Sequence, residues 1–130
     1  MTPYVRVLLL GGGAVLVFDA VASLASVALS FPYWYAAIGS CVIYLVVGGA
    51  AARYASVRLS ALAGALVGLV DATLGWAISW VIGPGRAAAG SLQLPRLIWT
   101  AAAVSLLAGA VASVGAALGH HGAGSQKAAA

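Results

Sequence analysis

The residues of this chain that could do chemistry are few, and its two carboxyl groups are the most unusual among them. Asp19 and Asp71 are the only acidic residues, and each lies near the middle of a long apolar run. A charged carboxylate at the centre of a lipid bilayer costs at least about 2.5 kcal/mol. Because no Lys or Arg stands at a matching depth, we expect the acids to be protonated and hydrogen-bonded, or to meet water or another subunit.

Two hypotheses follow for Asp19 and Asp71. In the first, the acids relay a proton or a cation through the membrane. In the second, they are protonated donors that bond to nearby hydroxyl groups and hold helices together or contact a partner protein. The candidate hydroxyl groups belong to Ser23, Ser40, Tyr44 and Ser105. The small number of other polar residues in the apolar runs favours the second hypothesis.

Other kinds of chemistry lack the residues they need. No nucleophile and base can be assembled at a common depth, so we expect no catalytic residue and no enzymatic activity. No cluster has metal-ligand spacing and no histidine lies within an apolar run, so we expect no metal site and no cofactor. The basic residues stand singly at the ends of the apolar runs, which is typical of topology anchors and not of nucleic-acid binding.

The elements that must position the acids are membrane helices. Hydrophobic residues make up 64% of the chain and charged residues only 6%, which fits lipid as the solvent. Each of the apolar runs is close to the roughly 20 residues that a helix needs to cross a bilayer. The sequence therefore predicts an all-α integral membrane four-helix bundle, a single transmembrane domain over 1–118. The expected helices cover 7–29, 33–52, 60–82 and 97–118, and 119–130 is expected to be a flexible cytoplasmic tail.

Basic and aromatic residues indicate the orientation of this bundle. Arg6, Arg53, Arg58 and Lys127 share one side, with only Arg86 and Arg96 on the other, so we expect both termini to be cytoplasmic. Aromatic residues gather near the opposite, outer ends of the helices. We interpret them as an interfacial belt, with a binding surface for a pigment, a quinone or a partner as the alternative. The belt residues are Tyr33, Trp34, Tyr35, Trp76, Trp80 and Trp99.

Small residues at helical spacing predict close helix packing. They form one stripe in the third run and another in the fourth, and such stripes let backbones approach closely in lipid. The pattern does not say whether the partner helix is internal or belongs to another chain. The stripe residues are Gly64, Gly68, Gly75 and Ser79, followed by Ser105, Gly109 and Ser113.

A weak internal repeat relates the two halves of the chain. Val17-Phe18-Asp19-Ala20 is echoed by Leu69-Val70-Asp71-Ala72, and Gly48-Gly49-Ala50 is echoed by Ala108-Gly109-Ala110. Each unit would be one helical hairpin that returns the chain to its starting side. The repeat therefore predicts two tandem, parallel hairpins related by an axis along the membrane normal.

Short segments resemble known membrane families. Gly48-Gly49-Ala50-Ala51-Ala52-Arg53-Tyr54 is similar to part of the Gly-rich signature of small fluoride channels, but the membrane-embedded asparagine of that family has no counterpart here. Asp19 invites comparison with small multidrug-resistance exporters, whose essential acid is a glutamate, a residue absent from this chain. The middle third, including the run from Ala63 to Asp71, resembles uncharacterised small bacterial four-helix membrane proteins. That resemblance implies a multi-pass protein of the bacterial inner membrane.

The leading hypothesis from the sequence is a small non-enzymatic membrane subunit. It would pack into a larger, energy-transducing complex or form a homo-oligomer, so its expected partners are lipid and either another membrane protein or a second copy. The alternative is a small proton- or cation-coupled transporter or channel that uses Asp19 and Asp71.

Overall fold

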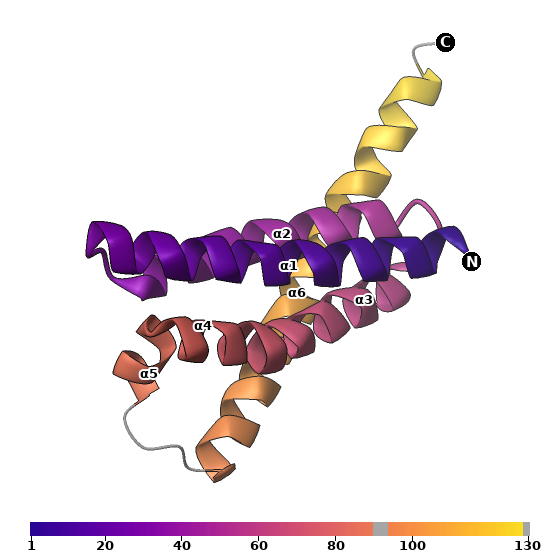
Figure 1. Cartoon of the computed structure of the whole chain (residues 1–130). Coiled ribbons are helices and arrows are strands. Elements are labelled where there is room, and N and C mark those ends of the chain that lie inside the picture. Colours follow the sequence, from indigo (N-terminus) through magenta and orange to yellow (C-terminus); the bar gives the residue numbers. More distant parts are fainter. Residues whose placement is uncertain (90–93, 129–130) are drawn as a thin grey trace.

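The computed structural model describes residues 1–89 and 94–128 of the chain. All regular structure in these residues is helical (Figure 1). Four helical segments are long and apolar enough to cross a membrane, as the sequence predicted. They cover Pro3–Leu29, Tyr33–Ala51, Val57–Ile82 and Leu94–Gly119.

The first two helices form a hairpin. Helix α1 (Pro3–Leu29) begins four residues earlier than expected, because the Thr2 side chain accepts a hydrogen bond from the Val5 amide and Pro3 suits the first turn. Ser30 ends α1 in the left-handed conformation, with φ of 55°. The 3₁₀ turn η1 (Tyr33–Tyr35) then leads into α2 (Ala36–Ala51).

The third span changes its helical form in the middle. It comprises α3 (Val57–Val70), the π-helical segment η2 (Asp71–Gly75) and α4 (Trp76–Ile82). Ser56 caps its start by accepting a hydrogen bond from the Leu59 amide, which explains why the helix begins three residues before the expected position. A π-helical turn widens the helix by one residue and is frequent at functional sites.

The last part of the chain departs most from expectation. Gly83 ends α4 with φ of 137°, and Pro84 starts an unpredicted short helix, α5 (Pro84–Ala89). Helix α6 (Leu94–Ala128) does not stop near Leu118 but continues through the segment expected to be a tail. No proline interrupts 119–128, so the backbone of this segment can continue as a helix.

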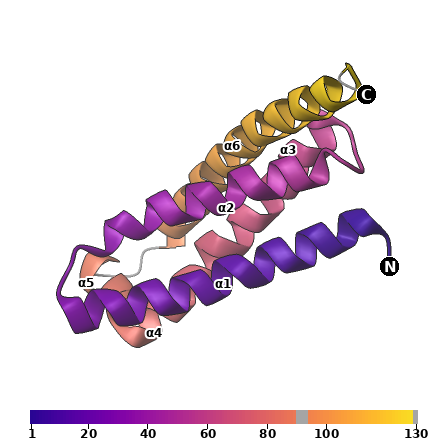
Figure 2. The same cartoon turned by 90° about the horizontal axis from the view of Figure 1, so that it is seen from above.

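The long helices pack as a bundle with α6 crossing the others obliquely (Figure 1). Helix α6 packs mainly against α3 and α2, whereas α1 lies on the far side of the bundle (Figure 2). The N-terminus and the end of α6 lie toward the same end of the molecule. The arrangement leaves many large apolar side chains exposed around the bundle, among them Leu10, Val17, Val81 and Leu106.

Candidate functional site

The two acids, which are 52 positions apart in the sequence, meet inside the bundle. Asp19 lies on α1 and is only 2% exposed, and Asp71 begins η2. Their carboxyl groups approach the same point of the bundle. They converge beside Gly75, where an added methyl group would overlap Asp19 Oδ2 and lie 3.1 Å from Asp71 Oδ1. The absence of a side chain at Gly75 therefore lets the carboxyl groups approach.

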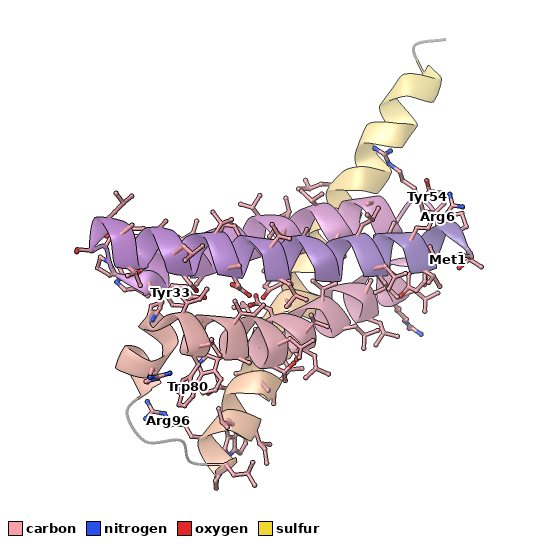
Figure 3. All side chains as sticks on the ribbon, in the orientation of Figure 1. Met1, Arg6, Tyr33, Tyr54, Trp80 and Arg96 are labelled. Carbon is pink, nitrogen blue, oxygen red and sulfur yellow. The ribbon has the colours of Figure 1, made fainter. Side chains whose placement is uncertain are left out.

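Two tyrosines from the second span hold the carboxyl pair. The Tyr44 hydroxyl, on α2, donates a hydrogen bond to Asp71 Oδ2. The Tyr33 hydroxyl donates to Asp19 Oδ1 over 3.4 Å. Tyr33 lies between α1 and α4, near a group of oxygen atoms that α1 and the third span enclose (Figure 3). Each acid thus has its own phenolic donor, and three spans contribute to the cluster.

Some buried polar atoms of this region have no partner. Among the described side chains, Asp19 Oδ2 and Ser23 Oγ are buried and accept or donate no hydrogen bond. Ser23, one turn after Asp19 on α1, is fully buried. Leaving such groups unsatisfied costs about 1–3 kcal/mol each. A proton shared between the two carboxyl groups would satisfy Asp19 Oδ2.

A cavity of about 210 Å³ opens beside the carboxyl pair. Asp19, Asp71 and both tyrosines line it, together with Trp34 and Trp76. Helix α6 contributes Thr100, Val104 and Leu107 to its wall. Within the described part of the chain, none of the lining residues is Lys, Arg or His. The acids therefore face a space whose walls carry no positive charge.

The small-residue stripes serve different contacts. Gly64 and Gly68 face α6, since an added methyl group would overlap Ala112 Cβ at the first and Ala108 Cβ at the second. Gly109 faces α3, where the Ala61 carbonyl oxygen would lie 3.1 Å from an added methyl group. The partner helix of this part of the stripes is therefore internal.

The other predicted packing residues do not act as a continuous stripe. Gly75 faces the carboxyl pair and not α6. Ser79 is buried and donates to the Trp76 carbonyl. Ser105 and Ser113 each bond to a carbonyl of their own helix, at 2.7 and 2.9 Å. Each of these hydroxyl groups donates its hydrogen bond to a carbonyl group of its own helix, so none of them links one helix to another.

The expected aromatic belt divides into two groups. Tyr33 and Trp76 are partly buried and line the cavity. Trp34 both lines the cavity and stacks on Tyr35, with ring centroids 4.0 Å apart. Trp99 is 76% exposed, as a belt residue would be. The Arg86 guanidinium group lies over the Trp80 ring, with its Cζ atom 4.6 Å from the ring centroid.

Tyr44 was among the hydroxyl groups that the sequence offered as partners for the acids, and that pairing is confirmed. Sequence reasoning missed the partnership of Tyr33 with Asp19, because its place among tryptophans suggested an interface residue. It also missed that the acids would meet each other. The predicted repeat would set both acids at one depth in helices that run in the same direction, so it was the one signal in the sequence that could have suggested the meeting.

Comparison of the chain with known proteins gives no match. No protein-family model, no curated protein and no solved structure matches it. In residues 1–89 and 94–128, no three His, Cys, Asp or Glu side chains gather as metal ligands would. The function must therefore be argued from the carboxyl pair and its cavity.

Proposed function

We propose that this chain is a small multi-pass membrane transporter that exchanges protons for a cationic substrate at Asp19 and Asp71. The observation that carries the proposal is the meeting of the buried Asp19 carboxyl group and the partly buried Asp71 carboxyl group at the wall of a cavity. Ionisable residues within membrane spans typically mark proton or ion pathways. The proposal assigns no catalytic reaction to the chain.

The carboxyl pair suits such an exchange on electrostatic grounds. Two carboxylates at close range repel each other, and a shared proton removes one of the negative charges. A cation bound in the cavity would compensate the same charge. The proton and the cation would therefore compete for one pair of groups, which is the basic requirement of an exchanger.

The apolar surface of the bundle supports a location in a membrane. Leu10, Val17 and Leu106 are examples of the large apolar side chains that the bundle exposes, and a water-soluble protein rarely exposes so many. We place both termini on the cytoplasmic side of a bacterial inner membrane. Arg6 and Arg96 lie toward opposite ends of the bundle (Figure 3), in keeping with the expected difference in basic residues between the two sides.

Proton movement in liposomes tests the proposal. Purified protein is reconstituted with a pH-sensitive dye inside, and inorganic and organic cations are added outside under an imposed pH gradient. We expect at least one cation to drive proton release that disappears in both Asp19→Asn and Asp71→Asn. Ser113→Ala is the matched control, because its hydroxyl group bonds only to the Gly109 carbonyl. If no cation drives protons in the wild-type protein, the proposal fails.

A packing subunit is the second candidate function. The sequence favoured it because the small-residue faces could bind a partner, but Gly64 and Gly68 face α6 of the same chain. One observation still favours it: nothing lies within 4 Å of a methyl group added at Gly12 or Gly13 on α1. Mild detergent extraction separates the candidates, since a subunit copurifies with a stable larger complex and an independent transporter does not.

A further inference from the structure

The cavity beside the carboxyl pair is larger than a proton or a bare metal ion requires. Its volume is about 210 Å³. An apolar cavity of roughly 150 Å³ already admits benzene, whereas drug-sized ligands need roughly 300 Å³ or more. The space therefore fits a small organic molecule, about as large as a ring with one short substituent.

The walls of the cavity favour a positive charge. Tyr33, Trp34, Tyr44 and Trp76 contribute aromatic rings, whose faces attract cations. The carboxyl groups add the only formal charges among the lining residues that the structure describes. The aromatic rings and the carboxyl groups therefore both favour a positively charged ligand.

The carboxyl groups in the cavity wall favour a ligand that donates hydrogen bonds. Asp19 and Asp71 both line the cavity, and an ionised carboxyl group accepts hydrogen bonds but donates none. An ammonium N–H would supply such a donor and would form a charge-assisted bond with a carboxylate. A quaternary ammonium has no N–H to donate, so a primary or secondary ammonium fits the site better.

We propose that this cavity binds a small organic ammonium ion. Its N–H groups face the carboxyl groups of Asp19 and Asp71, and its apolar carbon atoms lie against the aromatic rings of Trp34 and Trp76. The inference rests on the proposed function in that the ammonium ion would be the cation exchanged for protons at this carboxyl pair.

Binding to the purified full-length chain in detergent tests the proposal, with benzylammonium chloride as the probe. Benzyl alcohol has the same ring without the charge, and potassium chloride supplies a monovalent cation without the ring. We expect calorimetry to detect saturable binding of benzylammonium only. Equal binding of benzyl alcohol would overturn the proposal, since the site would then be merely apolar.

The single cysteine locates the bound probe. Cys41 lines the cavity and is partly exposed. Its labelling by a small thiol reagent should slow roughly tenfold at ten times the dissociation constant of benzylammonium, because only the free protein reacts. Calorimetric binding without protection of Cys41 would place the ligand elsewhere and would also overturn the proposal.

Two substitutions test the two kinds of contact. Asp19→Asn keeps the shape of the side chain but removes its charge, and we expect the affinity to fall by roughly 30-fold or more. Trp34→Leu should weaken binding by roughly fivefold or more. Trp99→Leu is its matched control, because Trp34 and Trp99 are 63% and 76% exposed but only Trp34 lines the cavity. Unchanged affinity in Trp34→Leu would contradict the aromatic contact, even if Asp19→Asn failed to fold.

Different results would refute the ammonium site and the proton–cation exchange. If potassium drives Asp-dependent proton release and benzylammonium does not bind, the exchanger stands and the organic ligand is refuted. If benzylammonium binds and protects Cys41 but no cation moves protons, the ligand site stands and the exchanger is refuted.

Discussion

At the scale of single residues, the hydrogen bonds to the acids have unequal importance. Tyr44 is 2% exposed and its hydroxyl bonds directly to Asp71, whereas Tyr33 is only half-buried and bonds to Asp19 over 3.4 Å. A long hydrogen bond is weaker than one of ordinary length. The two tyrosines therefore offer a direct comparison of strong and weak support for the carboxyl pair.

Tyr44→Phe should destabilise the protein more than Tyr33→Phe does. The first removes a buried donor and leaves an acceptor without its partner, which costs about 1–3 kcal/mol. The second should cost less than about 1 kcal/mol, near the average for side-chain hydrogen bonds in membrane proteins. Thermal unfolding in detergent measures both. Equal losses would mean that the two bonds support the pair alike.

Gly75 offers a second residue-scale prediction. Gly75→Ala should separate the carboxyl groups, because the added methyl group would overlap Asp19 Oδ2. We expect cation-driven proton release to fall sharply in liposomes while the helical content, measured by circular dichroism, is retained. Gly13→Ala adds the same methyl group where nothing lies within 4 Å, and it should keep wild-type flux. Normal flux in Gly75→Ala would show that the close approach is not needed.

At the scale of elements, the contact of α3 with α6 dominates the packing. Gly64, Gly68 and Gly109 bring the two backbones close, and there is little hydrophobic drive for helices to associate in lipid. The stability of this pair therefore depends on close van der Waals contact. The acids are positioned indirectly by the same contact, since Asp71 directly follows α3.

Gly68→Leu should destabilise the bundle itself. The larger side chain would collide with Ala108 Cβ and approach the Val104 carbonyl, and overpacking of this kind typically costs 1–3 kcal/mol. We expect a lower unfolding temperature and poor accumulation in the membrane. Leu66→Ile, at a 42% exposed position of the same helix, is the control and should be mild. A stable Gly68→Leu protein that only loses a partner would instead indicate an intermolecular face.

At the scale of the whole molecule, the chain crosses the bundle an even number of times. The N-terminus and the end of α6 lie toward one end, and the α1–α2 hairpin turn lies at the other (Figures 1 and 2). The cavity is lined by residues from all four spans, so its shape depends on the complete bundle. Both features follow from the order of the helices and not from any single one.

Cysteine labelling in intact cells checks the proposed orientation. In a Cys41→Ala background, Ser91→Cys should react with an impermeant thiol reagent added outside, and Ser125→Cys should not. Ser91 lies outside the described residues, in the connection between α5 and α6. The reverse pattern would invert the orientation, and reaction of both would contradict an even number of crossings.

Composition and the spacing of apolar runs were sufficient to predict an all-helical chain with four long apolar helices. An apolar run long enough to cross a bilayer is expected to be helical, because a helix pairs its backbone N–H and C=O groups within the same segment. The exact ends were less predictable, because the caps at Thr2 and Ser56 and the continued α6 depend on local hydrogen bonds and propensity. The tandem hairpin relation stays a prediction.

What the tertiary structure alone decided is which polar groups meet. The sequence identified Asp19 and Asp71 as costly residues that need partners, and it offered Tyr44 among several hydroxyl groups. The partners were settled by helix rotation and by the π-helical widening that begins at Asp71, which no apolar periodicity encodes. Side-chain contacts between helices depend on rotations of a few tens of degrees, whereas the apolar runs specify only that a helix forms. For that reason the acids could be recognised from the sequence, but the carboxyl pair and its cavity could not.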